Sequence, residues 1–251
     1  MNTITLITGA SRGLGRETAL NVARQGGDVI ATWRSNAGEA DALVAAIAAL
    51  GRKAVALQLD TADAASFPAF AECVREALRT TWQRETFDHL VNNAGHGHVA
   101  PIADTTQAQF DALVNVHFKG VFFLTQALLP LIADGGRIVN LSSGLTRFAF
   151  PGYAAYAAAK AAVEALTVYM AKELGPRGIT ANVVAPGAIE TDFGGGAVRD
   201  NAELNQRLAG ITALGRVGVP QDIGPMIAAL LGESNRWVNA QRIEVSGGQA
   251  I

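Results

Sequence analysis

The residues best suited to carry out chemistry are Tyr156 and Lys160, which stand four positions apart in the stretch Tyr156-Ala-Ala-Ala-Lys160. On a helix, residues four apart lie on the same face, so the phenol and the ammonium become neighbours. A free tyrosine has a pKa of about 10, and a nearby cation is expected to lower that pKa. The pair therefore predicts a general acid or base that works near pH 7.

Ser143 and Tyr153 set the limits of this interpretation. Ser143 follows the apolar run 138–141, a predicted buried strand, so its hydroxyl is expected where open α/β sheets bind ligands. Tyr153 has Ala157 four positions on, so its phenol lacks a cation and is expected to pack or to line a pocket. The alternative interpretation of Tyr156 and Lys160 is a packed aromatic ring beside a solvated charge.

Composition indicates a folded protein whose net charge gives it no special affinity for nucleic acids or membranes. Of the 251 residues, 49% are apolar and 17% charged, which suits a large core and excludes disorder. The net charge of -2 gives no basis for binding nucleic acid or membrane surfaces. Cys73 is the single cysteine and is interpreted as a buried, inert thiol; no metal site is expected. A strand-like run starts at residue 4 and no apolar run reaches about 18 residues, so we expect a cytoplasmic protein without signal peptide or membrane span.

A glycine-rich turn follows the first predicted strand, which ends at Thr8, and leads into a predicted helix at 16–25. Such a turn lets backbone N–H groups and the helix dipole meet a pyrophosphate. The spacing is G-x-x-x-G-x-G, and the alternative is a tight turn without a ligand. The residues of the turn that we expect to contact a dinucleotide are Gly9, Ser11, Arg12, Gly13, Leu14 and Gly15.

The end of the second predicted strand, 29–33, indicates which dinucleotide binds. NAD enzymes place an acidic residue there to bind the ribose hydroxyls, but this strand is followed by Arg34 and Ser35. Arg34 can bind a 2′-phosphate, with help from Ser35 and from Arg12 of the glycine turn. The sequence therefore favours NADPH; the alternative is two solvated surface arginines.

The remaining strands predict one domain, residues 1–251. A third strand ends at Asp60, whose carboxylate can meet the adenine amino group, and a fourth closes with small residues at 92–95 that allow a cofactor to approach. Helices alternate with the strands, and Gly194-Gly195-Gly196 is a predicted hinge for a mobile segment reaching to about Gly215. Seven such strands predict an α/β fold, a doubly wound Rossmann-type parallel sheet with helices on both faces.

Taken together, these motifs resemble the short-chain dehydrogenase/reductase family from end to end. The resemblance rests on the glycine turn, Asn92-Asn93-Ala94-Gly95, Ser143, Tyr156-x-x-x-Lys160, Pro186-Gly187 and the C-terminal 242–248 stretch. It implies hydride transfer between NADP(H) and a carbonyl, of ketone or 3-oxoacyl type, or the reverse alcohol oxidation. It further implies that Ser143 binds the substrate oxygen, Tyr156 exchanges the proton, and Lys160 tunes Tyr156 and holds the ribose. Family members are commonly tetramers, so a homo-oligomer is expected.

The resemblance also implies cofactor contacts beyond the glycine turn. Besides Arg34, Ser35, Tyr156 and Lys160, the positions that match the family's cofactor contacts are Asp60, Asn92, Ala94, Gly95, Pro186, Gly187, Ile189 and Thr191.

One position departs from the family pattern. Members carry a catalytic asparagine that helps to hold a water between the active-site lysine and solvent. Matching Phe110-Asp111 and Gly120-Val121 without gaps places His117 there, with Asn115 two residues early. A histidine adds a ring that titrates near pH 6.5, so His117 is the predicted fourth catalytic residue. The alternative is a bulged helix in which Asn115 takes the role.

Other functions on the same scaffold are a nucleotide-binding regulator and an isomerase or dehydratase; intact Ser143, Tyr156 and Lys160 argue against the regulator. The sequence leaves the substrate open. The aromatic residues that are candidates for an apolar substrate pocket, or alternatively for the core, are Phe148, Phe150, Tyr153 and Phe193.

Overall fold

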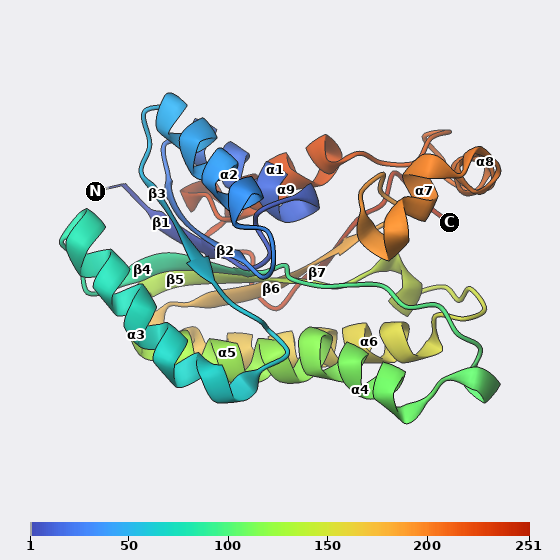
Figure 1. Cartoon of the computed structure of the whole chain (residues 1–251), viewed down its shortest axis with the longest axis horizontal. Helices are drawn as coiled ribbons and strands as arrows, with labels where there is room; N and C mark the ends of the chain where they lie inside the picture. The colour runs from blue at the N-terminus through green and yellow to red at the C-terminus, as the bar shows by residue number, and fades with distance from the viewer. Residues whose placement is uncertain (1) are drawn as a thin grey trace.

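A sheet of seven parallel strands runs through the computed structural model, which describes residues 2–251 (Figure 1). The strands are β1 (Ile4–Ile7), β2 (Asp28–Trp33), β3 (Ala54–Gln58), β4 (Phe87–Asn92), β5 (Ile132–Leu141), β6 (Thr180–Pro186) and β7 (Arg242–Val245). Their order is β3-β2-β1-β4-β5-β6-β7. The central strands are almost continuously buried because helices cover both faces of the sheet. The predicted fold class is confirmed.

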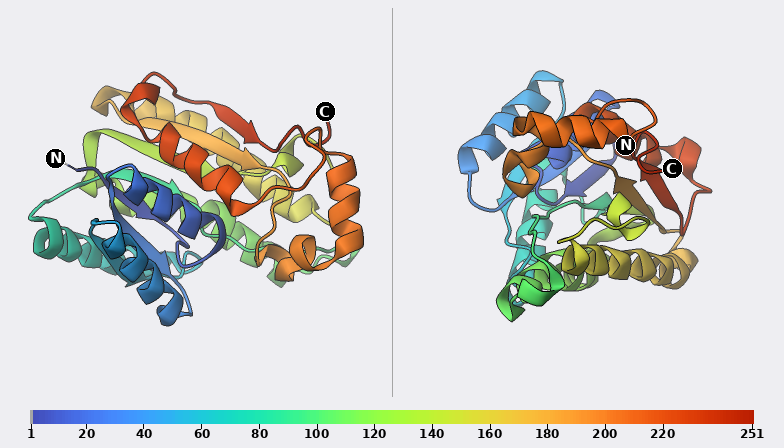
Figure 2. Two further views of the ribbon diagram at one scale, coloured as in Figure 1. Left: turned by 90° about the horizontal axis from the view of Figure 1, so that it is seen from above. Right: turned by 90° about the vertical axis from the view of Figure 1, so that its right-hand side faces the viewer.

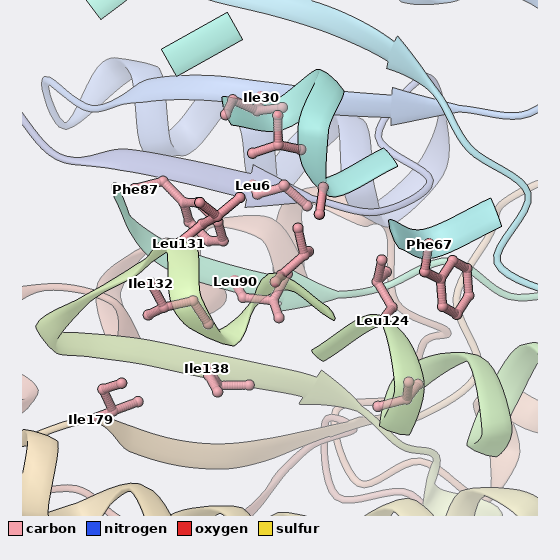
Figure 3. Packing of buried hydrophobic residues seen from close by; sticks show 14 of the residues in the cluster. Leu6, Ile30, Phe67, Phe87, Leu90, Leu124, Leu131, Ile132, Ile138 and Ile179 are labelled. Carbon is pink, nitrogen blue, oxygen red and sulfur yellow. The ribbon is translucent and has the colours of Figure 1, made fainter. Parts of the chain in front are cut away.

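Helices form one layer on each side of the sheet (Figures 1 and 2). One layer holds α1 (Gly13–Arg24), α2 (Ala37–Ala49) and α9 (Pro220–Leu230). The other holds α3 (Phe67–Ala77), α4 (Gln107–Val114), α5 (Gly120–Leu128) and α6 (Ala154–Leu174). Each layer buries its own apolar cluster against the sheet, and Figure 3 shows the cluster beneath α3 and α5, in which Phe67, Phe87 and Leu124 are almost fully buried.

Local sequence explains where several helices begin. The Asn36 side chain caps α2 by accepting the Glu39 N–H, and Thr106 and Gln109 form a reciprocal capping box at the start of α4. Pro220 opens α9, where its missing N–H has no helical partner to lose. These caps fix the directions in which the helices leave the strand ends, and therefore the walls of the site.

The lid segment after β6 contains α7 (Ala197–Asp200) and α8 (Ala202–Gly210). Three successive glycines, Gly194, Gly195 and Gly196, precede α7 with φ of 62°, 74° and 80°. This left-handed run is a backbone path that other residues adopt only with strain.

Several sequence expectations are corrected. β5 begins at Ile132, before the predicted run 138–141, because Gly135 and Gly136 permit an irregular start that still pairs Ile132 with Phe87. The polar stretch at 80–86 follows α3. α3 continues there as a π-helical turn, η2 (Leu78–Trp82), whose Trp82 indole donates to Asp28 Oδ2 at 2.9 Å. Cys73 is exposed, not buried.

The helical run from Gln107 to Leu131 is long and apolar enough to cross a membrane by length and composition, which the sequence analysis did not expect. In the fold it packs against the sheet, and 44% of its most apolar window is buried. Such burial is typical of a core helix.

Candidate active site

The glycine turn lies at the carboxyl edge of the sheet, beside the neighbouring strands β1 and β4. From β1 the chain continues toward one side of the sheet, and from β4 toward the other, and ligands bind at such a point. Gly9 and Gly13 have φ of 63° and 56°, and a Cβ on Gly9 would lie 2.9 Å from Ala94 Cα. A Cβ on Gly15 would collide with the Gly9 carbonyl oxygen. No side chain caps the N-terminus of α1 and its first turn holds no acidic residue, so its N–H groups fit a pyrophosphate.

The adenosine end of this cleft presents polar side chains to solvent. Arg34 and Ser35 are exposed just after β2, and Asp60 is exposed after β3, where its Oδ1 accepts the Ala62 N–H. Arg12 is also exposed, and its Nη1 lies 3.8 Å from a carboxylate oxygen of Asp192, which precedes the lid. Arg34 and Ser35 follow the end of β2, where no acidic residue stands, and their side chains fit a 2′-phosphate.

The segment after β4 contributes its backbone and its second asparagine. The Asn92 side chain is buried and donates to Asn140 Oδ1 and Thr125 Oγ1, so a cofactor contact at this position would be made by its backbone. The sequence analysis missed the role of Asn93, whose Nδ2 donates to the carbonyls of Thr8 and Gly9 and holds the glycine turn in place. Its position next to a motif of small residues was the available signal. Ala94 and Gly95 lie beside the turn and the His117 ring, as a cofactor contact requires.

The loop after β6 forms the far wall of the cleft. Pro186 ends the strand, and a Cβ on Gly187 would lie 2.8 Å from Gln249 Oε1. Ile189 pairs with Gly218, and Thr191 lies with its methyl group next to Gly13 of the glycine turn. Thr191 therefore lies beside the glycine turn, and its cofactor contact stays a prediction.

The three expected catalytic side chains converge at the ends of β5 and α6. Tyr156 and Lys160 share one face of α6, with Lys160 Nζ 5.9 Å from the centre of the Tyr156 ring. The Ser143 side chain, whose Oγ accepts the Leu145 N–H at 3.2 Å, lies beside Tyr156 and lowers the pKa of its phenol. Lys160 Nζ donates to the Leu141 carbonyl at 2.7 Å, which ties α6 to the end of β5. Tyr153 is half-buried and is the N-cap residue of α6, one position before the helix begins.

Burial shifts the pKa values of Tyr156 and Lys160, and the pKa of Tyr156 moves in the direction opposite to the expected one. Burial raises the pKa of Tyr156 above its ordinary value, and the Ser143 side chain lowers it only in part. Burial also lowers the pKa of Lys160 to about 7. The expectation that the Lys160 charge dominates Tyr156 is therefore wrong: the phenol is held as a proton donor.

His117 lies against Tyr156, and its role at the water beside the active-site lysine stays a prediction. The two rings meet edge to face with centres 5.1 Å apart, and His117 Nε2 donates to the His96 carbonyl at 2.7 Å. Burial, and then the Lys160 charge, hold the pKa of His117 well below 6.5, so its expected titration near that pH is corrected. Its Nδ1 has no hydrogen-bond partner among residues 2–251.

The helix around His117 does bulge, because residues Asn115–Lys119 form a π-helical turn, η4, between α4 and α5. The Asn115 carbonyl accepts the Gly120 N–H inside this turn. The bulge therefore exists without moving Asn115 to the position beside Tyr156. The sequence analysis missed His96, whose ring lies 5.4 Å from that of His117.

Aromatic rings flank the catalytic residues. The Phe193 ring packs on Tyr156 with centres 5.7 Å apart, is 41% exposed, and touches the position a Cβ on Gly97 would take. Phe148 and Phe150 are half-buried, and their rings contact each other with centres 5.3 Å apart and planes tilted by 60°. These rings belong to the rim of the site rather than to the buried core.

Comparison with known proteins agrees with this geometry. Residues 9–250 match the family model described as enoyl-(acyl carrier protein) reductase. The chain is 34% identical to tetrahydroxynaphthalene reductase PfmaG of Pestalotiopsis fici, over 98% of this chain and 90% of the relative.

Solved structures agree as well. The reductase LugOII, which catalyses keto-reduction at C1 during lugdunomycin biosynthesis, is 37% identical with a TM-score of 0.94, covering 99% of this chain and 98% of that one. The angucycline C-6 ketoreductase LanV, solved with bound NADP, is 32% identical with a TM-score of 0.94, covering 99% and 95%. The chain belongs to the short-chain dehydrogenase/reductase family.

Proposed function

We propose that this chain is an NADPH-dependent carbonyl reductase. The observation that carries the proposal is the convergence of Ser143, Tyr156 and Lys160 beside a glycine turn that fits a pyrophosphate. When bound, NADPH supplies the hydride. The glycine turn, Arg12, Arg34 and Ser35 would hold its phosphates, and Thr191, Ala94 and Gly95 would line its path.

The chain's own residues supply the proton and orient the substrate. The Ser143 hydroxyl can bind the carbonyl oxygen while Tyr156 Oη donates its proton to that oxygen. A buried phenol whose pKa is raised is protonated at neutral pH, so Tyr156 can serve as the proton donor in reduction. Lys160, held on the Leu141 carbonyl, fixes the direction of α6 beneath Tyr156.

We propose an aromatic, ring-fused ketone as the substrate class. Phe193, Phe148 and Phe150 are rim residues whose faces can stack on a planar substrate. PfmaG is by name a tetrahydroxynaphthalene reductase, and LanV an angucycline ketoreductase. The supporting features are therefore the rings of this chain and the substrates in its relatives' names.

We further propose that the enzyme acts as a cytoplasmic homotetramer. Large apolar side chains stand exposed on the outer faces of α5 and α6: Phe122, Phe123, Val168 and Tyr169 are 40%, 41%, 52% and 67% exposed. Association of copies would bury them. Light scattering of the purified protein measures the state, and a monomer would contradict the proposal.

The test is turnover with a bicyclic aryl ketone such as 1-tetralone and with a 3-oxoacyl thioester, each with NADPH and NADH. We expect stoichiometric loss of NADPH absorbance, faster with the aryl ketone. An isomerase or dehydratase would convert its substrate without consuming NADPH, and a regulator would bind NADPH without turnover.

Arg34→Asp tests the cofactor assignment. We expect the ratio of kcat/KM for NADPH over NADH to fall by about tenfold or more, because a charge-assisted contact is lost. Arg236→Asp, at an exposed arginine far from the glycine turn, is the matched control. An unchanged ratio in Arg34→Asp would contradict the role of Arg34.

A further inference from the structure

Glu164 lies on the same helix as the catalytic pair, four positions after Lys160 and eight after Tyr156. The three side chains therefore share one face of α6. The Glu164 carboxylate is only 21% exposed and reaches from this face toward the loop that carries Ser143.

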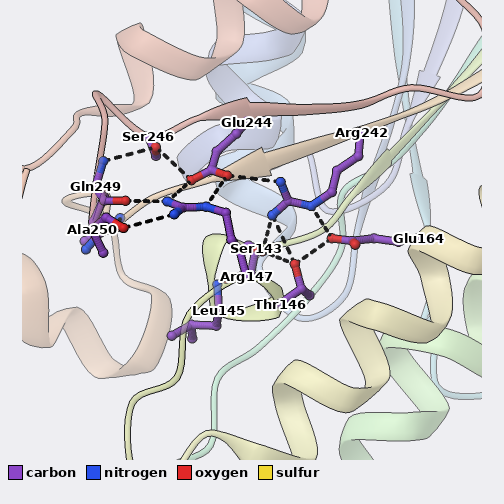
Figure 4. A network of polar contacts seen from close by, with 11 residues as sticks. Ser143, Leu145, Thr146, Arg147, Glu164, Arg242, Glu244, Ser246, Gln249 and Ala250 are labelled. Carbon is purple, nitrogen blue, oxygen red and sulfur yellow. Dashed lines mark hydrogen bonds and ion pairs between the residues drawn. The ribbon is translucent and has the colours of Figure 1, made fainter.

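One oxygen of Glu164 accepts hydrogen bonds from the residues on both sides of Ser143. Figure 4 shows its contacts with Thr146 and Arg242. Glu164 Oε1 lies 2.6 Å from Ser142 Oγ, 2.7 Å from Thr146 Oγ1 and 2.8 Å from Arg242 Nε. Ser142 precedes Ser143, and Thr146 ends the short helical turn that Ser143 begins. The loop is thus fixed to α6 at two points that bracket Ser143.

Arg242, on β7, completes the contact from the opposite side. Its Nη2 donates to the Ser143 carbonyl at 3.3 Å and to Thr146 Oγ1 at 3.0 Å, while its Nη1 pairs with Glu244 at 3.1 Å. Glu244 in turn holds Arg147 at the end of the same loop. Arg242 and Glu164 therefore hold the Ser143 backbone between β7 and α6.

We propose that Glu164 is a positioning residue for catalysis, which acts through Ser143 by fixing the serine loop to the helix that carries Tyr156. The inference rests on the proposed function. A carboxylate that served only to stabilise the fold would not need to bracket the residue that binds the substrate oxygen. Glu164 itself touches neither substrate nor cofactor.

The first test compares Glu164→Ala and Glu164→Gln with Glu173→Ala, a matched control at an exposed carboxylate on the same helix. We expect Glu164→Ala to lower kcat by about 10- to 100-fold, as misplacement of a reacting group does, with KM for NADPH little changed. Glu164→Gln keeps an acceptor oxygen and should recover most of the loss. Equal kcat in Glu164→Ala and Glu173→Ala, or a loss confined to KM for NADPH, would overturn the proposal.

A double-mutant cycle separates positioning from general stability. If Glu164 acts through Ser143, then Glu164→Ala in a Ser143→Ala background should cost little further kcat, because the two changes share one effect. Additive losses would show that Glu164 acts elsewhere and would overturn the inference. Ellipticity and melting temperature, followed in parallel, identify variants that fail to fold; the glutamine variant then decides.

The proposed function and this inference fail in different ways. If the wild type reduces no carbonyl, the proposed function is wrong, and crystal structures of the wild type and Glu164→Ala still read out the loop. We expect Ser143 to move away from Tyr156 in Glu164→Ala, and an unmoved Ser143 would overturn the inference. If the wild type turns over and Tyr156→Phe does not, kinetics test Glu164 alone.

Discussion

Tyr156 owes its behaviour to burial more than to the spacing that singles it out. The side chain is 7% exposed, and moving a phenolate out of water outweighs the help of a lysine whose own charge is also disfavoured by burial. Helical spacing predicts which residues meet. It does not report how much water the fold removes from them, so the sign of the pKa shift could not be read from the sequence.

Replacing Tyr156 by phenylalanine should remove nearly all turnover while NADPH still binds, because the change deletes one oxygen and little volume. We expect kcat to fall by roughly 100- to 10,000-fold, the usual contribution of a general acid. Tyr153→Phe is the matched control, since Tyr153 is a half-buried phenol without a lysine beside it. Steady-state kinetics and NADPH fluorescence titrations measure both; a larger loss in Tyr153→Phe would mean that the wrong tyrosine was chosen.

His117 should affect turnover as a neutral ring. Because burial and Lys160 keep its pKa well below 6.5, its charge does not change at neutral pH, and the kcat profile between pH 6 and 8 should be the same in His117→Asn as in the wild type. His117→Leu, which removes both ring nitrogens, should slow turnover more than Asn115→Leu. The reverse order in these two leucine variants would return the role to Asn115, and a pH inflection that disappears in His117→Asn would contradict a neutral ring.

Among the elements, the π-helical turn η4 shows what sequence patterns do not predict. Periodicity predicted every strand, and the glycine turn, Ser143, Tyr156 and Lys160 were placed correctly at the carboxyl edge. A π-helical turn repeats the same residue types as the α-helix around it, so only a departure from the family spacing hinted at η4. The contacts of Asn92 and Glu164 depend on partners from distant strands, which no local pattern contains.

The lid between Gly194 and Gly215 should order over bound substrate. Its glycines adopt left-handed conformations, and a Cβ on Gly194 or Gly195 would meet no atom within 4 Å, so this hinge is free to turn. We expect hydrogen exchange in α8 to slow when NADPH and a non-reacting alcohol product are both bound. Exchange in α2, which lies outside the lid, is the internal control. Equal exchange rates in α8 with and without ligands would argue against closure.

For the whole molecule, the buried Lys160 is a functional group that lowers the stability of the fold. Its folded pKa of about 7 lies below the unfolded value of 10.5, so the folded state binds fewer protons between these pH values. The free energy of unfolding therefore rises with pH across this window, and the penalty is fully present below pH 7.

Lys160→Met should raise the free energy of unfolding at pH 7 by about 2–4 kcal/mol, after about 1 kcal/mol is lost with the hydrogen bond to Leu141. The gain should shrink toward pH 10. Urea denaturation at several pH values measures it. Lys172→Met, at an exposed position on the same helix, should change stability little; a gain in Lys160→Met that is independent of pH would contradict the assigned cause.

The strand order also bears on how the chain folds. β1 pairs with β2 through Thr5 and Val29, only 24 positions apart, but reaches β4 through Thr5 and His89, 84 positions apart. The first three strands can therefore pair early, while closing the long loop to β4 is entropically slower. The glycine turn that we expect to bind the dinucleotide packs against the residues that follow β4. A nascent chain thus acquires most of its first half-sheet before it can recognise its cofactor, and NADPH can trap only molecules that have passed the slowest pairing.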